Sequence, residues 1–141
     1  TGLTLSGSTH GNTAVQYALA QLGKPYVFAA AGPNAFDCSG LTMAAWAAAG
    51  VALPHLAAGQ VAYGTAEPTD LSQAVSGDLV MIPGSDGTAQ APGHVGMVAG
   101  YVDEKDGRHL FVVQAPETGV PVILTEATEW SGQIVDVRHI A

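Results

Sequence analysis

The only cysteine of the chain, Cys38, lies in the motif DCSG at residues 37–40, directly before a long run of small and apolar residues. A cysteine thiolate is a nucleophile, and the free backbone N–H groups at a helix N-terminus can stabilise an oxyanion. The helix dipole contributes only about 0.3–1 kcal/mol to ionising a thiol, so a base must assist. The motif therefore predicts a cysteine nucleophile at a helix start. The alternative is a small buried hydrophobic residue.

The chain has five histidines that could act as the base. His94 follows the Pro92-Gly93 break and begins an apolar stretch, where a strand holds a ring more firmly than a loop does. Gly96, two residues further, leaves space on the same face. His55 follows Leu53-Pro54 in a loop, where it is either simply exposed or lines a cleft. The remaining histidines are predicted at surface positions: His10, His109 and His139.

Gln114 is a candidate for orienting the base. The strand from His94 and the strand ending at residue 115 are joined by DEKDG, which predicts a hairpin. If the pairing is symmetric about residue 105, Gln114 lies one diagonal step from His94 on the same face. Its side-chain carbonyl would then accept a hydrogen bond from the imidazole Nδ1–H. A slip of one residue would leave Gln114 on the other face, as a polar edge residue without a catalytic role.

The elements that must position these residues fall into two groups. Residues 12–24 are predicted as an amphipathic helix capped by Asn12, residues 38–49 as an Ala-rich helix, and residues around 56–64 as a short helix. Short β-branched runs separated by turn signals follow at 77–83, 94–102, 109–115, 120–126 and 133–140. Helices first and strands second predict an α+β domain, with helices packed on a five- to six-stranded antiparallel sheet.

Length and charge exclude several classes of protein. A chain of 141 residues fits one domain. Residues 1–11 are predicted as a linker or disordered lead-in, and residues 12–141 as a single domain. A net charge of −8 with only four Lys and Arg excludes a nucleic-acid-binding surface and disfavours an acidic membrane surface. The apolar run at 41–53 is too short to span a bilayer. The start at Thr1 without Met is interpreted as that of a mature or excised fragment.

The order of several motifs resembles the NlpC-type cell-wall cysteine peptidases, a papain-like superfamily. The motifs are GKPYVFAAAGPNAFDCSGL, SGDLVMIP, PGHVGMVAG and VVQAP, and the resemblance covers about residues 12–140. It implies a papain-like fold and hydrolysis of peptidoglycan stem peptides, usually between the γ-carboxyl of D-Glu and a diamino acid such as meso-diaminopimelate. It also implies no cofactor, a secreted or cell-wall location of bacterial or phage origin, and a monomer or a module of a larger cell-wall enzyme.

The resemblance assigns roles to individual residues. Cys38 matches the nucleophile, His94 the base and Gln114 the third polar position. Tyr26 and Asp37 would recognise the free N-terminal amine of the stem peptide, because a carboxylate can pair with an ammonium and a phenol can donate. The substrate-binding set implied in this way consists of Tyr26, Asp37, Ser39 and His55. No metal ligands are implied.

The chain also departs from the family pattern. Phe28-Ala29-Ala30 stands where Trp-Gly-Gly is usual, which could narrow the cleft, and Ala57-Ala58 replaces a common serine. The long segment 84–93 is predicted to form a cleft wall or a lid. These departures keep two alternatives open. One is a non-catalytic module that binds peptidoglycan or a partner protein, and the other is an amidase or acyltransferase acting on another amide.

Overall fold

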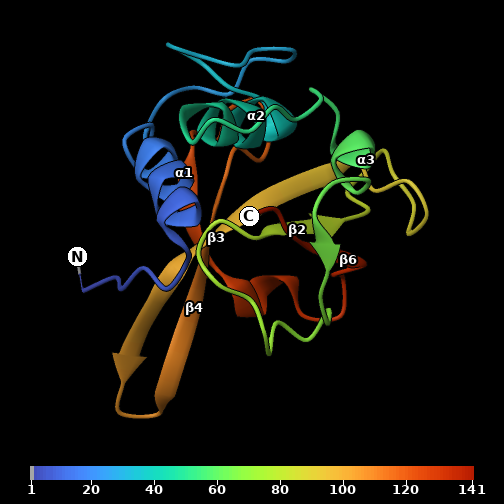
Figure 1. The fold of residues 1–141 in the computed structure, drawn as a ribbon. Helices are drawn as coiled ribbons and strands as arrows, with labels where there is room; N and C mark the ends of the chain where they lie inside the picture. Colours follow the sequence, from blue (N-terminus) through green and yellow to red (C-terminus); the bar gives the residue numbers. More distant parts are fainter. Residues whose placement is uncertain (1) are drawn as a thin grey trace.

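Three helices precede most of the strands along the chain, in the order that the sequence predicts. The structure, a computed structural model that describes residues 2–141, places α1 at Thr9–Leu19, α2 at Cys38–Ala48 and α3 at Ala57–Gln60 (Figure 1). The Ala-rich helix predicted over 38–49 is confirmed almost to the residue. Within residues 2–141, no helix has both the length and the apolar character needed to cross a membrane.

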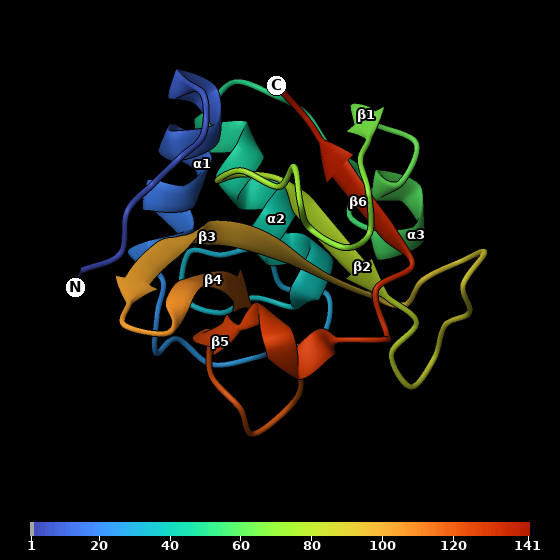
Figure 2. The same cartoon turned by 90° about the horizontal axis from the view of Figure 1, so that it is seen from below.

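Six strands form one sheet in which every strand pair is antiparallel. The order across the sheet is β1-β6-β2-β3-β4-β5, so β6 at the end of the chain lies between β1 and β2 (Figure 2). The predicted α+β class with an antiparallel sheet is confirmed. The bounds of the strands are Thr65–Ala66 for β1, Leu79–Ile82 for β2, His94–Glu104 for β3, Gly107–Gln114 for β4, Ile123–Glu126 for β5 and Asp136–His139 for β6.

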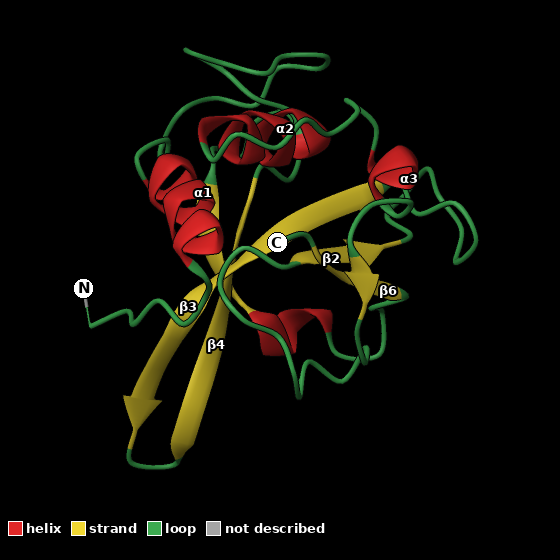
Figure 3. Ribbon diagram, viewed as in Figure 1, coloured by secondary structure: helices red, strands yellow, loops and turns green. Residues whose placement is uncertain are grey.

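The sheet is covered on both faces. Helices α1 and α2 lie on one face, and the 3-10 helix η1, at Ala127–Trp130, lies on the other (Figure 3). Alternate residues of β2 divide accordingly, because successive side chains of a strand point to opposite faces. Leu79 and Met81 pack in the core beneath the helices, whereas Val80 and Ile82 pack with η1. The helix η1 has no counterpart in the sequence-based prediction.

The first helix differs from the prediction. It begins at Thr9 rather than residue 12 and ends at Leu19, because Ser8 is the cap and accepts a hydrogen bond from Gly11 N at 3.0 Å. Asn12, the predicted cap, instead accepts from Gly7 N at 2.9 Å. Ahead of the helix, Thr4 pairs with Tyr101 of β3 through hydrogen bonds in both directions.

A β-bulge sets the register of the β3–β4 hairpin. Near its turn, Glu104 pairs with Gly107, but the pairing shifts by one residue between Val98 and Gly100. Beyond the bulge, Met97 pairs with Val113, which is the predicted register symmetric about residue 105. Without the extra residue of the bulge, the register set by the tight turn would continue along the hairpin. The side chain of Gln114 would then lie on the opposite face of the sheet. The bulge therefore brings Gln114 to the face that carries His94.

Candidate active site

Cys38 is the first residue of α2, as the sequence predicts. Asp37 caps this helix, and one of its carboxylate oxygens accepts from Gly40 N at 2.7 Å while the other accepts from Ala29 N at 2.8 Å. Gly40 is required here, because a Cβ at that position would lie 2.0 Å from the carbonyl oxygen of Ala30. The cap thus fixes the start of α2 and, with it, the partly buried thiol of Cys38.

His94 begins β3 and is bonded to Gln114, as predicted, but through the other ring nitrogen. Nε2 of His94 lies 2.7 Å from Oε1 of Gln114. Because an amide oxygen can only accept, Nε2 carries the proton and Nδ1 is the nitrogen that can accept one. The prediction that Nδ1–H donates to Gln114 was therefore wrong. A ring held in this tautomer is suited to act as a general base.

Thr125 of β5 holds the amide of Gln114 in this orientation. Nε2 of Gln114 donates to Oγ1 of Thr125 at 2.8 Å, and both side chains are buried. Since the amide nitrogen is engaged by Thr125, its oxygen is turned to His94. Sequence reasoning missed Thr125, because its position depends on the pairing of β4 with β5, in which Gln114 lies opposite Ile123.

Trp130, at the end of η1, packs edge-on against the His94 ring, with centroids 5.5 Å apart and planes at 79°. The space predicted beside Gly96 is the space that this indole occupies, because a Cβ on Gly96 would lie 2.9 Å from Trp130 Cη2. Trp130 is nearly buried and keeps that side of the ring away from water. Its role was also missed, and Gly96 was the only signal in the sequence that pointed to it.

Cys38 and His94 open into the same cleft of about 530 Å³. Tyr26 and Gln114 line it as well, so four of the predicted site residues come together there. Segment 84–93 contributes to the cleft wall, and Phe28 stands on the rim with 83% of its surface exposed. The full lining consists of Tyr26, Phe28, Cys38, Ile82, Gly84, Ser85, Asp86, Gly93, His94, Gln114, Pro116, Glu117, Thr118 and Trp130.

The other three predicted site residues lie behind the cleft and are not part of its lining. Asp37 is buried, and the oxygen that accepts from Gly40 also lies 2.7 Å from Nε2 of His55. Ser39 is buried, and its carbonyl oxygen accepts from Gln60 Nε2 at 3.1 Å. Asp37, Ser39 and His55 therefore lie around the first turn of α2, and none of them lines the cleft.

The electrostatics of the site favour an uncharged thiol on Cys38 and an uncharged imidazole on His94. Burial raises the pKa of the Cys38 thiol and the charge of Asp37 acts in the same direction, although backbone hydrogen bonds from Val95 and Ser39 oppose them. The backbone N–H groups at the helix start thus favour the thiolate, as expected, but do not outweigh burial. Burial also lowers the pKa of His94, outweighing the opposing hydrogen bond to Gln114. Both directions favour a protonated thiol and a neutral imidazole in this cleft.

Tyr26 is placed to donate a hydrogen bond into the cleft. Its pKa is raised, first by burial and also by the nearby negative charge of Asp37, so the phenol keeps its proton. Side chains able to converge on a metal ion occur, among the described residues, at Glu67, Asp78 and His139, which lie outside this cleft.

Comparisons with known protein families and with individual proteins agree on one family. The model of the NlpC/P60 family matches residues 23–138. A probable endopeptidase of Mycobacterium tuberculosis is 39% identical over 125 residues, which cover 89% of this chain and 28% of the relative. A probable endopeptidase p60 of Listeria monocytogenes is 31% identical over 119 residues, covering 84% of this chain and 22% of the relative. The chain thus spans less than a third of the length of these curated relatives.

Solved structures share the fold. NlpC2 from Trichomonas vaginalis superposes with a TM-score of 0.79 at 24% identity, covering 96% of this chain and 49% of that one. The NlpC/p60 domain of the peptidoglycan hydrolase SagA gives a TM-score of 0.72 at 24% identity, covering 92% of this chain and 98% of that one. The predicted papain-like arrangement, with helices on an antiparallel sheet and the cysteine at a helix start, is confirmed.

Proposed function

Because this chain belongs to the NlpC/P60 family, we propose that it is a cysteine endopeptidase that hydrolyses the stem peptides of peptidoglycan. The observation that carries the proposal is the cleft shared by Cys38 at a helix start and His94, whose ring is bonded to Gln114. The relatives named probable endopeptidases support the reaction class. Since the substrate is the cell wall, we place the activity outside the cell or at the wall.

The geometry supports acyl transfer through the sulfur atom. Nδ1 of His94 takes the thiol proton as Sγ of Cys38 attacks the carbonyl carbon, so no free thiolate has to accumulate. The tetrahedral oxyanion accepts hydrogen bonds from backbone N–H groups at the start of α2 and from the Tyr26 phenol. His94 then gives its proton to the leaving amine, which leaves a thioester on Cys38. In the second half of the reaction, His94 deprotonates a water molecule that hydrolyses the thioester, and the proton then returns to the sulfur to regenerate the thiol.

The charge of the cleft favours a substrate that carries an ammonium group. Two carboxylates, Asp86 and Glu117, are part of its lining, which contains no Lys or Arg. A stem peptide offers such groups in its free N-terminal amine and in the side-chain amine of a diamino acid. We therefore assign the cut to the bond between the γ-carboxyl of D-Glu and meso-diaminopimelate. Tyr26 would contact the peptide, while Asp37, Ser39 and His55 would act from behind the thiol.

The test uses the free stem peptide L-Ala-γ-D-Glu-meso-diaminopimelate-D-Ala and mass spectrometry. We expect the chain to release L-Ala-D-Glu, and we expect the Cys38→Ala variant to release none while retaining the native thermal transition. Transfer of the acyl group to an added amine instead of water would identify an acyltransferase. Full activity of Cys38→Ala, or an intact peptide together with a Cys38 that iodoacetamide does not label even at alkaline pH, would overturn the proposal.

A further inference from the structure

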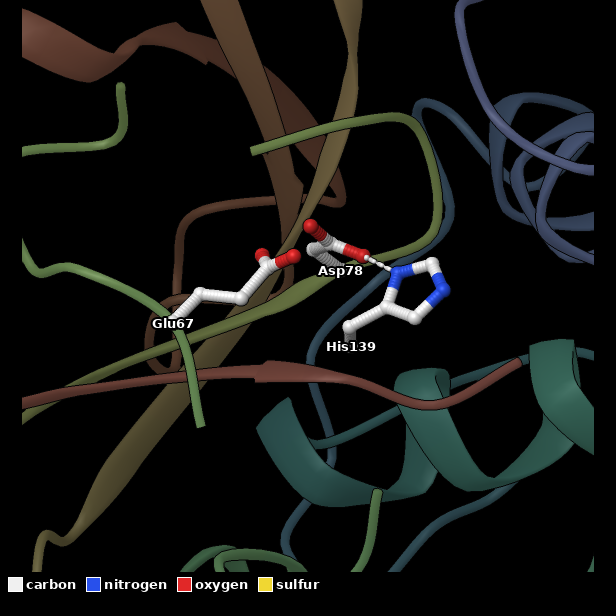
Figure 4. Close-up of side chains that lie close together, drawn as sticks. All are labelled: Glu67, Asp78 and His139. Carbon is white, nitrogen blue, oxygen red and sulfur yellow. Dashed lines mark hydrogen bonds and ion pairs between the residues drawn. The ribbon is translucent and has the colours of Figure 1, made fainter. Parts of the chain in front are cut away.

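Three side chains with metal-binding atoms converge outside the lining of the catalytic cleft (Figure 4). Glu67 follows β1, Asp78 precedes β2, and His139 is the last residue of β6. One ligand atom from each residue lies within 4.8 Å of the other two. Nδ1 of His139 is 2.8 Å from Oδ1 of Asp78, whose side chain is 1% exposed. The group is therefore compact and partly shielded from water.

The backbone fixes the positions of all three residues. Glu67 N donates to the carbonyl oxygen of Val137 at 2.9 Å, which ties the residue after β1 to β6. β2 pairs with β6 through Leu79 and Arg138, the immediate neighbours of Asp78 and His139. A site built on paired strands is preorganised, because the strand pairing holds the ligands before any ion binds.

The charges of this group are not balanced by the surrounding residues. Oε1 of Glu67 is buried without a hydrogen-bond partner, and it is the only such side-chain nitrogen or oxygen found among residues 2–141. The carboxylate of Glu67 lies beside that of Asp78, and the nearby cation Arg138 is paired with Asp136 at 2.7 Å. A buried acceptor without a partner is costly. The unpaired oxygen is thus an acceptor beside a second carboxylate, an arrangement that either a cation or a proton would relieve.

We propose that Glu67, Asp78 and His139 bind a divalent cation of the zinc type, at a site independent of the catalytic cleft. One imidazole and two carboxylates are ligands that Zn²⁺ accepts, and water would complete a four-coordinate shell. On binding, His139 is a neutral ring with its proton on Nε2, so the lone pair of Nδ1 becomes the ligand, and an imidazolium would release its Nδ1 proton to solvent. Oδ2 of Asp78 already accepts from Val75 N at 2.9 Å, which would hold the carboxylate in place.

The expected role of the ion is to stabilise the fold. It would join three segments, β1, β2 and β6, that are distant in the sequence and lie side by side in the sheet. An ion that binds only the folded state stabilises it by mass action. The competing explanation is that a proton, and not a metal ion, lies between the two carboxyl groups. Burial and the neighbouring Asp78 raise the pKa of Glu67 to about 7, so a protonated Glu67 could instead donate a hydrogen bond to Asp78.

The chain provides a matched control in the His109 cluster, which contains the same residue types. His109 lies between Asp106, 2.7 Å from Nε2, and Glu126, 3.0 Å from Nδ1. Because the two carboxylates sit on opposite ring nitrogens, one ion cannot be bound by all three side chains. A His109→Gln substitution therefore removes a comparable histidine without touching the proposed site.

The experiment measures zinc binding by the Cys38→Ala chain, since the thiol and His94 could themselves bind zinc. Metal-free protein is titrated with zinc sulfate by calorimetry, and thermal unfolding is followed with and without zinc. We expect one ion per chain and a rise in Tm of roughly 10 °C at zinc concentrations about a hundredfold above Kd. Glu67→Gln and His139→Gln should each weaken binding by about tenfold or more, and His109→Gln should leave it unchanged.

Two results would overturn the proposal. The first is the absence of zinc binding, or binding that persists in both Glu67→Gln and His139→Gln. The second is a Glu67→Gln variant that is more stable than its parent without zinc, while zinc leaves the Tm of the parent unchanged. That outcome would assign the cluster to a proton shared by two carboxyl groups. Neither result depends on peptidase activity, so the proposed function is tested separately.

Discussion

Replacing Thr125 by valine tests whether the amide of Gln114 is the device that orients His94. The substitution exchanges a hydroxyl for a methyl group of similar size and removes the acceptor that lies 2.8 Å from Gln114 Nε2. Both side chains are no more than 8% exposed, so water cannot readily replace the lost hydroxyl. A buried donor left without a partner costs about 1–3 kcal/mol.

This cost sets the expected loss of activity. Gln114 can relieve it only if its amide turns and the proton of His94 moves from Nε2 to Nδ1, so that the amide N–H donates to Nε2 and Nδ1 can no longer accept a proton. Since 1.36 kcal/mol corresponds to a factor of ten in rate, we expect kcat to fall by roughly 5- to 100-fold. KM should change little, because Thr125 is not part of the cleft lining.

The assay is hydrolysis of the stem peptide, with kcat and KM determined separately at several pH values. The hydrogen bond that His94 donates to Gln114 raises the pKa of His94 against the effect of burial, so its loss should shift the acid limb of the profile to lower pH. Thr125→Ser keeps the hydroxyl and serves as the control, with kcat close to the parent value. An unchanged kcat in Thr125→Val, or an equal loss in both variants, would refute this reasoning.

Three further predictions concern the environment of His94 and Cys38. In the free enzyme, kcat/KM should rise with pH through a midpoint below the ordinary histidine value of 6.5, because burial lowers the pKa of His94 and only the neutral ring accepts a proton. Alkylation of Cys38 by iodoacetamide should increase only at alkaline pH, and substantial labelling in acid would instead show a thiolate. Gly96→Ala would place a Cβ 2.6 Å from Val112 Cγ1 and 2.9 Å from Trp130, so urea unfolding should show a loss of about 1–3 kcal/mol, together with a lower kcat. A variant as stable and as active as the parent would show that the indole has room to move.

The parts of the site that the sequence predicted depend on short-range patterns. Cys38 is recognisable because a capping residue and an apolar run surround it, and His94 because it begins a strand after a proline-glycine break. Gln114 depended on the register of one hairpin, which a local turn and one bulge determine. Cys38 and His94 can be found from their neighbouring residues alone, whereas the position of Gln114 was predicted correctly only because a bulge that the sequence analysis did not predict restores the assumed register.

The remaining parts depend on packing between distant segments. Thr125 and Trp130 reach the site through the β4–β5 pairing and a 3-10 helix that has no periodic signature. The raised pKa of Cys38 could not be predicted, because the contribution of the helix dipole can be estimated from the sequence, whereas burial and the distance to Asp37 cannot. The substrate-binding role of Asp37 stays a prediction, and its carboxylate accepts from two backbone N–H groups and lies beside His55.

The nucleophile and the base belong to different layers of the molecule. Cys38 starts a helix, His94 starts a strand, and the contact of the thiol sulfur with Gly93 at 3.9 Å joins positions 55 residues apart. Such a contact forms late in folding, because the entropy of closing a long loop must be offset by the packing of α2 on the sheet. A chain still emerging from the ribosome, or one partly unfolded by heat, therefore has a cysteine and a histidine but no catalytic pair. Assembly of the tertiary structure therefore creates the pair on which the proposed activity depends.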